Sequence, residues 1–346
     1  ESIINVRIDR SKKMPATVFF KALGINLATL IHYFGENQII LDTEAKDGLS
    51  EQGSQTNEAL AHIFKKMKPG EPLTPESISN FLIQKFFDYK RYDLQIVGRH
   101  KIRRKLGICE RLVGVRIAED IVANKGTPEE HVFFKAGTVL TKEAITVLID
   151  NEVFHTNHIE KIPADNQILK DAVRRCMPIG RTDDQLLAKI NKTFEGYVNI
   201  LKVYDANNNG VNVIGTDLNN TNEWLTLSDI IALFSYLLNS MVGIGTEDDI
   251  DNLGNRRIRC VGELVQTQFR IGLSKLVKNI SQKMPVALSS ADEKAPKIKS
   301  LIVIKPLTNA IRDCFSTNQL SQVADQVNPL SELTHKRRTS SLGQGG

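Results

Sequence analysis

Apolar side chains recur every three or four residues in several stretches of the chain, and this spacing predicts amphipathic helices. These stretches are 15–34, 142–150, 230–241 and 263–280. Capping residues support two of them, since Thr141 directly precedes the second stretch and Thr226-x-x-Asp229 forms a capping-box pattern before the third. Thr74 followed by Pro75 predicts one more helix start, and that helix would end near Phe87. Helices should therefore dominate the fold.

Strand patterns are fewer and shorter. Residues 197–204 and 211–214 are rich in β-branched and aromatic side chains and flank a polar turn, so they predict a hairpin, and 131–141 alternates weakly enough to predict one strand. Two polar stretches, 36–58 and 284–300, predict surface loops. We therefore expect an α+β fold that is helix-rich and multi-lobed, with small mixed β-sheets and hairpins.

Composition narrows the class of protein. The 346 residues are 41% apolar and 25% charged, which favours a soluble globular chain of two or three domains. Four cysteines lie far apart and form no C-x-x-C pair, and with no export signal this favours reduced thiols and a cytoplasmic location. The sequence begins at Glu1 rather than Met and stops soon after a basic cluster, so we expect a piece of a longer chain.

Positive charge is concentrated locally, although the formal net charge is only +5. Three clusters contain it: Arg99, Lys101, Arg103, Arg104 and Lys105; Arg256, Arg257 and Arg259; and His335, Lys336, Arg337 and Arg338. Such clusters are typical of nucleic-acid binding, but each is also compatible with a solvated surface. Asp251 could accept from a base amino group while Arg256 contacts phosphate, or both could belong to a local salt-bridge network.

Several motifs fail on inspection. Gly243-Ile244-Gly245 lacks the third glycine of a dinucleotide fingerprint, because Asp248 stands there. His155-x-x-His158 has no neighbouring third ligand for zinc. The segment 205–210 resembles the first half of a calcium loop, but Thr216 occupies the position of the bidentate glutamate, so a hairpin turn is the simpler interpretation. We assign no catalytic residue and no metal ligand.

The last thirty residues resemble a known family. The run Asn328-Pro329-Leu330-Ser331-Glu332-Leu333-Thr334-His335-Lys336-Arg337-Arg338 is similar to the rifamycin-pocket segment of the bacterial RNA polymerase beta subunit. Four more segments agree in the family's order: Arg7-Ile8-Asp9-Arg10 with Met14-Pro15-Ala16-Thr17, Lys68-Pro69-Gly70-Glu71-Pro72, Arg91-Tyr92-Asp93-Leu94 with Val97-Gly98-Arg99, and 249–257 with Val261-Gly262-Glu263. The resemblance covers nearly the whole chain and is weakest over 150–225.

The resemblance implies a function and a division of the chain. It implies part of a DNA-directed RNA polymerase, a nucleotidyltransferase, whose catalytic Mg²⁺ is held by the partner beta-prime subunit, so this piece should not be active alone. Implied partners are beta-prime, the alpha subunits, a sigma factor, DNA template, RNA transcript and rifamycin-class inhibitors, in a cytoplasmic, nucleoid-associated complex without a membrane. The implied regions are a lobe over 1–248, a fork-proximal DNA-contact segment over 249–262, a helical return into the protrusion over 263–318, and the start of the fork and rifamycin-pocket segment over 319–346.

The resemblance also implies roles for individual residues. The implied rifamycin pocket comprises Gln319, Leu320, Ser321, Gln322, Asp325, His335, Arg338, Ser340 and Leu342. Three of these, Gln322, His335 and Arg338, should lie along the path of the nascent RNA. The implied DNA-binding residues are Asp251, Leu253, Arg256 and Arg259.

Some positions depart from the family pattern. Val323-Ala324 replaces the usual Phe-Met, Ser316-Thr317-Asn318 replaces Gly-Ser-Ser, and Asn252 replaces His. Smaller side chains remove buried area, at about 25 cal/mol per Å². We therefore expect the RNA-path function to be retained and leave rifamycin affinity open. The alternatives to a polymerase segment are a non-enzymatic nucleic-acid-binding protein and a scaffold whose charges are solvated.

Overall fold

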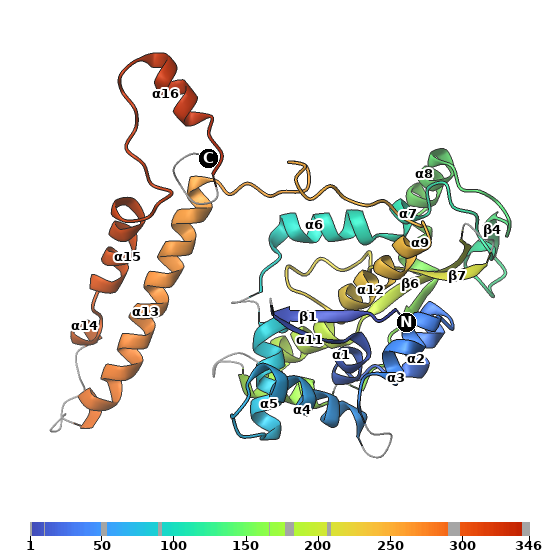
Figure 1. Ribbon diagram of the computed structural model, residues 1–346, viewed down its shortest axis with the longest axis horizontal. Coiled ribbons are helices and arrows are strands. Elements are labelled where there is room, and N and C mark those ends of the chain that lie inside the picture. The colour runs from blue at the N-terminus through green and yellow to red at the C-terminus, as the bar shows by residue number, and fades with distance from the viewer. Residues whose placement is uncertain are drawn as a thin grey trace. The chain divides into compact units, whose positions relative to one another are not determined.

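The computed structural model describes residues 2–9, 11–49, 54–88, 92–165, 167–176, 183–205, 209–289 and 298–340. The chain divides into two compact units, residues 1–247 and 248–346 (Figure 1). The fold class is α+β, as predicted, with helices in both units, and the strands of the described residues lie in the first. The described strand pairings are antiparallel, so the sheets are not mixed.

The first unit begins with a two-stranded antiparallel ribbon that leads into a group of helices. The ribbon consists of β1 (Asn5–Asp9) and β2 (Lys12–Pro15). The helices that follow are α1 (Ala16–Ala22), α2 (Leu27–Phe34), α3 (Gln38–Ala45), α4 (Gln55–Met67), α5 (Pro75–Leu82), the π-helix η1 (Ile83–Phe87), α6 (Gln95–Leu106) and α7 (Ile108–Arg111).

The rest of the first unit alternates short strands with helices. Its elements are β3 (Ile121–Ala123), β4 (His131–Phe134), α8 (Lys142–Asp150), α9 (Val153–Thr156), β5 (Ile159–Lys161), α10 (Gln167–Cys176), α11 (Asp183–Phe194), β6 (Tyr197–Tyr204), β7 (Gly210–Gly215) and α12 (Leu227–Met241). The hairpin β6–β7 pairs residue by residue from Asn199–Gly215 to Tyr204–Gly210, and β5 adds a third strand beside β6.

The hairpin separates two hydrophobic cores. In β6, Val198 belongs to the larger core, while Leu201 and Val203 belong to the smaller one; in β7, Ile214 and Val213 divide in the same way. Neighbouring side chains on a strand point to opposite faces, which explains this division. The hairpin is therefore the shared wall of both cores.

The larger core gathers the N-terminal helices around α12. Every residue of α1 is buried. Phe234 of α12 packs edge-on against Phe20 of α1 and Phe34 of α2, at ring-centroid distances of 4.8 and 5.1 Å. Such edge-to-face pairs add stability beyond their buried area. Within the described residues no single helix is long and apolar enough to cross a membrane, and α1 with α2 reaches that composition only as a pair bent by 114°.

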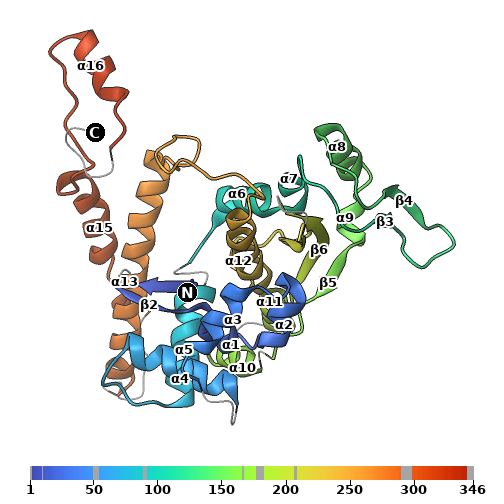
Figure 2. The same cartoon turned by 45° about the vertical axis from the view of Figure 1, so that its right-hand side comes forward.

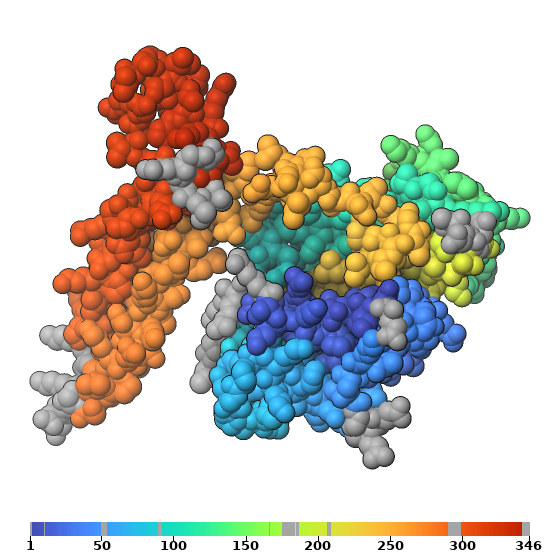
Figure 3. All heavy atoms as spheres, viewed as in Figure 1, coloured from blue at the N-terminus to red at the C-terminus, as the bar shows by residue number. Residues whose placement is uncertain are grey.

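The smaller core lies at the other end of the unit, where α7, α8, α9 and the β3–β4 ribbon cover the second face of the hairpin. Figure 2 shows α8, β3 and β4 together at the end of the unit opposite α4 and α5. In the space-filling view the green residues of this part form one continuous lobe (Figure 3). Its buried centre includes Ile117, Leu148 and Phe154.

The second unit is built on two packed helices. Its elements are α13 (Val261–Ser289), α14 (Ile298–Leu301), α15 (Lys305–Ser316) and α16 (Pro329–Lys336). The helices α13 and α15 approach closely at Gly272, where an added Cβ would lie 2.9 Å from Leu307 Cδ1 and 3.1 Å from the Cβ of Ala310. Apolar residues elsewhere on this unit stay exposed, among them Val277, Val286 and Phe315.

Capping residues gave the most accurate sequence predictions. Thr74 caps α5 by accepting from the Ser77 N–H at 3.2 Å, and the helical segment ends at Phe87 as predicted. Thr141 caps α8 over the predicted range, and the hairpin is confirmed. The Thr226–Asp229 box is also confirmed, although α12 begins three residues earlier than predicted.

The predicted helix over 15–34 is wrong in its middle, where Gly24 separates α1 from α2. Gly24 has a φ of +83°, and an added Cβ would lie 1.9 Å from the Asp165 carbonyl oxygen. The Asp165 N–H donates to the Gly24 carbonyl at 2.9 Å. Asn26 then starts α2 by accepting from the Thr29 N–H at 2.8 Å. A distant backbone contact, invisible in the apolar spacing, breaks the helix.

Three other element predictions need correction. The supposed loop 36–58 contains α3 and the start of α4, because Ile40 and Leu60 are buried in the larger core. The supposed strand 131–141 ends at Phe134, and Val139 contributes only an isolated bridge to Arg116. In 284–300, α13 continues to Ser289 despite Pro285, and α14 begins at Ile298. The residues between them lie outside the described part.

A glycine comparison tests the backbone contact that ends α1. Gly24→Ala should lower the free energy of unfolding by about 2–4 kcal/mol, because it combines strain at positive φ with a clash against backbone that cannot move cheaply. Gly70→Ala is the matched control: its φ is +93° but no atom lies within 4 Å of the added Cβ. It should cost only about 1 kcal/mol. Urea unfolding followed by fluorescence of the single tryptophan measures both, and equal losses would contradict the contact.

Candidate nucleic-acid interface

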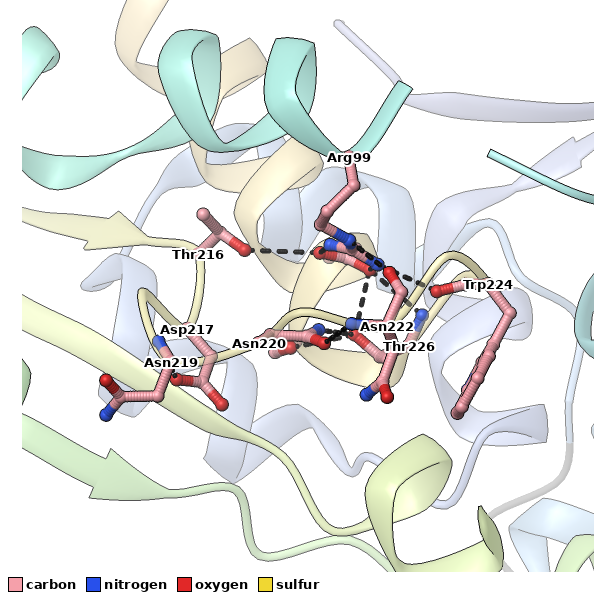
Figure 4. Close-up of polar contacts among 10 residues, drawn as sticks. Arg99, Thr216, Asp217, Asn219, Asn220, Asn222, Trp224 and Thr226 are labelled. Carbon is pink, nitrogen blue, oxygen red and sulfur yellow. Dashed lines mark hydrogen bonds and ion pairs between the residues drawn. The ribbon is translucent and has the colours of Figure 1, made fainter. Parts of the chain in front are cut away.

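Arg99, the first arginine of the predicted basic cluster on α6, is buried rather than presented to solvent. The residue is 4% exposed, and its side chain forms a bidentate ion pair with fully buried Asp229, with Nη1–Oδ1 and Nη2–Oδ2 distances of 2.7 and 2.9 Å. Nε donates to the Asn222 carbonyl at 2.5 Å and Nη2 to the Trp224 carbonyl at 2.7 Å. Figure 4 shows the guanidinium reaching from α6 into the polar turn before α12.

The Asp229 carboxylate also accepts hydrogen bonds from other donors. Thr216 donates to its Oδ1 at 3.1 Å, and the Thr226 N–H and hydroxyl donate to Oδ2 at 3.0 and 2.8 Å. A buried carboxylate needs this many donors, since an unpaired buried charge is very costly. The interpretation of Arg99 as a nucleic-acid contact is therefore wrong, because its guanidinium joins α6 to the end of β7 and the start of α12.

The other basic residues of α6 divide into two groups. Lys105 turns back onto its own unit, donating to the Thr246 carbonyl at 2.8 Å and hydroxyl at 3.0 Å and lying 5.4 Å from the Tyr236 ring centre. Arg103 and Arg104 lie nearer the surface, and Arg104 is exposed. Nearby Arg111 is buried too, donating to Ser235 Oγ at 2.9 Å, and burial lowers its pKa to about 10, which leaves it protonated at neutral pH.

The segment around Asp251 is shaped by local hydrogen bonds. Asp249 Oδ1 accepts from the Asp251 N–H at 3.0 Å, and Asn252 Oδ1 accepts from the Gly254 N–H at 2.9 Å. The Asn255 amide donates back to the Asp249 carbonyl at 2.8 Å. Asx turns of this kind give a loop a defined course without burying it. The loop is consequently ordered by its own side chains.

The predicted DNA-binding residues all lie in this exposed segment. Asp251, Leu253 and Arg256 are exposed, and none of their side chains has a polar partner within the described residues. Glu263 instead pairs with Arg257 at 2.8 Å and more weakly with Arg259 at 3.8 Å. The alternative of a local salt-bridge network therefore applies to the arginines near Glu263, while Asp251 and Arg256 remain available to a ligand.

Two side-chain contacts join the extended segment after Asn318 to α16. Gln322 Oε1 lies 3.1 Å from His335 Nε2, and Ser331 Oγ donates to Asp325 Oδ2. The hydrogen bond from Ser331 is the main cause that lowers the pKa of Asp325, aided by the Val327 N–H and by the charge of His335. The structure thus brings together Gln322, Asp325 and His335, which the sequence placed up to 13 residues apart.

The remaining predicted pocket residues lie on the surface of the same unit. Ser321 donates to the Phe315 carbonyl at 2.9 Å, and Gln319, Leu320, Arg338 and Ser340 are exposed. Leu342 lies outside the described residues. Val323, which departs from the family pattern, is 93% exposed.

The described residues offer no group of side chains that could bind a metal ion. No three His, Cys, Asp or Glu side chains gather in ligating geometry among the residues that the structure describes. His155 instead contacts Asn219 Oδ1 at 2.8 Å, and His158 Nε2 accepts from the Val122 N–H at 3.1 Å. Burial lowers the pKa of His158, which favours the neutral ring that can accept this hydrogen bond.

Sequence reasoning missed Asp229 as the partner of Arg99. The available signal was the capping box, which marked Asp229 as a carboxylate beside an apolar helix, but nothing in the spacing linked it to an arginine 130 residues earlier. The environment of Arg103 and Arg104 was equally hidden, because helices distant in sequence surround it.

Comparison with known proteins adds independent information. The family model described as RNA polymerase Rpb2, domain 2, matches residues 1–123 and 180–259. The DNA-directed RNA polymerase subunit beta of Enterococcus faecium is 38% identical over 355 aligned positions, and that of Staphylococcus carnosus is 38% identical over 352. The subunit beta of Streptococcus agalactiae is 37% identical over 352. Each alignment covers 100% of this chain and 27% of the relative, so the chain spans about a quarter of their length.

The buried ion pair gives a sharp stability prediction. Arg99→Ala should lower the free energy of unfolding by about 3–5 kcal/mol, because Asp229 would keep its charge without its partner. Arg104→Ala, on the same helix but exposed, should change it by no more than about 0.5 kcal/mol. Urea unfolding monitored by Trp224 fluorescence compares the two. Similar values for both variants would show that the Arg99 pair does not stabilise the unit.

The Asp325 contact predicts a pH dependence. Because native hydrogen bonds lower the pKa of Asp325, they stabilise the segment above the ordinary Asp pKa of about 3.9, and this contribution disappears as the pH falls through the lower native pKa. Ser331→Ala should raise the pKa of Asp325 toward its ordinary value, as followed by the carboxyl ¹³C shift. Ser316→Ala is the control, because the Ser316 hydroxyl donates to the Arg312 carbonyl of its own helix, away from Asp325. An unchanged titration in Ser331→Ala would rule out the contact.

Proposed function

The chain belongs to the RNA polymerase Rpb2 domain 2 family, and we propose that it forms part of the beta subunit of a DNA-directed RNA polymerase. The observation that carries this proposal is alignment along 100% of the chain with relatives bearing that name. The activity would be templated RNA synthesis from nucleoside triphosphates by the assembled enzyme. This chain would guide nucleic acid and would supply no catalytic residue of its own.

The proposed assembly supplies what the chain lacks. Mg²⁺ would be held by the beta-prime subunit, and the other partners would be the alpha subunits and a sigma factor, on DNA template and RNA transcript, in the cytoplasm at the nucleoid. Residues 1–248 would form the lobe and 263–318 the return into the protrusion. The exposed apolar side chains of α13 and α15 agree with this assignment, because an isolated helix pair leaves such a face without cover.

The segment 249–262 is the proposed contact with DNA near the downstream fork. Asp251 offers two acceptor oxygens to a base amino group, and Arg256 offers a planar fork to a base edge or phosphate. The Asx turns that order this loop support the proposal, since they hold both side chains in the open without consuming them. Leu253 and Arg259 would lie against the same strand.

The segment 319–346 is the proposed boundary of the RNA path and of a rifamycin pocket. Gln322 and His335 already lie in hydrogen-bonding distance, and Arg338 follows on the exposed end of α16. Amide, imidazole and guanidinium donors suit the sugar and phosphate oxygens of RNA. A rifamycin bound to this surface would block extension by occupying the path of the transcript.

Templated synthesis under drug tests the proposal. The native complex containing the parent chain is assayed for RNA synthesis on a DNA template while a rifamycin is titrated. Templated synthesis is the expected result. Transcripts that stall at very short length under the drug would indicate, in addition, that the rifamycin pocket is intact. RNA synthesis that the drug does not inhibit would leave the polymerase proposal standing and would attribute the resistance to the positions that depart from the family pattern. Failure of an intact complex to synthesise RNA would favour a non-enzymatic nucleic-acid-binding protein.

The departures at Val323 and Ala324 predict a gain of drug binding. Val323→Phe with Ala324→Met should lower the rifamycin concentration that halves RNA synthesis about tenfold, because the larger side chains restore apolar area against the drug. Val327→Phe adds the same ring at another exposed position, 84% accessible, and should have no such effect. Unchanged sensitivity of the double variant would refute the shape argument.

The proposed DNA contact predicts a change in salt dependence. If Arg256 contacts phosphate, Arg256→Ala should reduce the slope of log binding constant against log salt by about 1. Arg312→Ala, an exposed arginine on α15, should leave the slope unchanged. Fluorescence anisotropy of a labelled fork-shaped DNA with the native complex gives both slopes, and identical slopes would remove Arg256 from the interface.

A further inference from the structure

A pocket of about 530 Å³ opens in the first unit between α6–α7 and α8–α9. One face of α6 lines it with His100, Arg103 and Arg104, and α9 contributes His155 from the opposite side. Ile149, which is 52% exposed, and partly exposed Leu218 form an accessible apolar floor above buried Leu148 and Phe154. Its volume falls within the range of about 300–1,000 Å³ typical of small-molecule sites.

The two arginines at this pocket are not used by the fold. Neither Arg103 nor Arg104 has an ion pair or side-chain hydrogen bond within the described residues, nor does His100. Their neighbours on α6 behave differently, since Arg99 pairs with Asp229 and Lys105 bonds Thr246. One carboxylate, Glu110, also lines the pocket, so cationic groups outnumber it. The charge favours an anionic ligand.

His155 is held in place from behind. Asn219 donates through Nδ2 to the His155 carbonyl at 3.2 Å, which leaves Asn219 Oδ1 to accept from His155 Nδ1 at 2.8 Å. The Asn219 backbone is in turn fixed by a 3.0 Å bond from its N–H to Asp217 Oδ1. Because Oδ1 can only accept, Nδ1 carries the proton and Nε2 is free for a ligand. The ring is a positioned contact rather than a mobile surface group.

The residues that line this pocket come both from the matched family domain and from the stretch that interrupts the match. The family match ends at residue 123 and resumes at 180, so α6 and α7 lie inside it, while α8 and α9 lie in the stretch that interrupts it. The interrupting stretch supplies Ile149 of the floor and His155, while Leu218 lies inside the family match. The complete pocket therefore requires this stretch as well as the family domain.

We propose that this pocket binds a mononucleotide, with its phosphate on Arg103 and Arg104 and its nucleoside over the apolar floor made by Ile149 and Leu218. Two adjacent guanidinium forks match phosphate oxygens bidentately. Inorganic phosphate alone would leave the apolar floor uncovered, whereas a nucleoside fills it. Glu110 accepts from a ribose hydroxyl or a base amino group, and the His100 and His155 rings flank the base.

The test uses the native complex that contains the parent chain and 8-azido-AMP as the probe. Photolabelled peptides are mapped, which separates this pocket from any other nucleotide site on the complex. The expected adducts fall on residues lining the pocket, and unlabelled AMP competes for them. Labelling of other regions only, or labelling here that AMP does not compete, would overturn the proposal.

Variants assign the binding to the two arginines. Arg103→Ala with Arg104→Ala should weaken labelling at least tenfold, because charge-assisted hydrogen bonds to phosphate are lost. Lys101→Ala removes a charge from the same helix outside the pocket and should change labelling less than twofold. Wild-type labelling in the double alanine variant would overturn the proposal. If that variant does not assemble, Arg103→Lys with Arg104→Lys keeps the charge without the fork, and an undiminished signal there would equally overturn it.

Competitors identify the source of the phosphate. Inorganic phosphate should compete at least tenfold more weakly than AMP, because it makes no contact with the floor. If a short single-stranded oligonucleotide competes better than AMP, the ligand is the end of a nucleic acid and not a free nucleotide. Templated RNA synthesis measured in the same preparation reports the polymerase proposal separately, so failure of one proposal is distinguishable from failure of the other.

Discussion

The ion pair between Arg99 and Asp229 connects three parts of the first unit that are far apart in sequence. Arg99 comes from α6, Asp229 lies in the first turn of α12, and Thr216, directly after β7, donates to the same carboxylate. A buried pair of this kind contributes little net energy over an apolar replacement, but each charge demands the other. The pair links these elements, and Phe234 of α12 packs against Phe20 of α1 and Phe34 of α2 in the larger core.

In the same unit the β6–β7 hairpin has an apolar environment on both faces. Side chains that alternate along each strand enter different cores, so a register shift of one residue would exchange them. The second unit follows another principle. Its candidate binding segments are held by Asx turns and by pairs such as Gln322–His335, which order the backbone but leave side chains exposed. One unit is stabilised by its interior, while the other exposes ordered polar segments.

The basic residues of α6 show why local charge is a poor guide to function. Arg99 and Arg103 are four residues apart on one helix, yet the first is consumed by a buried carboxylate and the second lines an open pocket. A count of positively charged residues along this stretch of sequence treats Arg99 and Arg103 as equivalent. Their difference comes from α12 on one side and from α8 and α9 on the other, elements that lie outside the window.

Local chemistry was sufficient for helix caps and for the hairpin, because each rests on contacts between residues close in sequence. The segment Asn328–Arg338 was identified by its resemblance to a known family instead. The α+β class also followed from local chemistry, since apolar period and turn residues are local properties. The break at Gly24, the burial of Arg99 and the pocket around Arg103 were not accessible in this way. Each results from contact with a segment distant in the chain, at Asp165, Asp229 and His155 respectively, and such contacts exist only after the chain has packed.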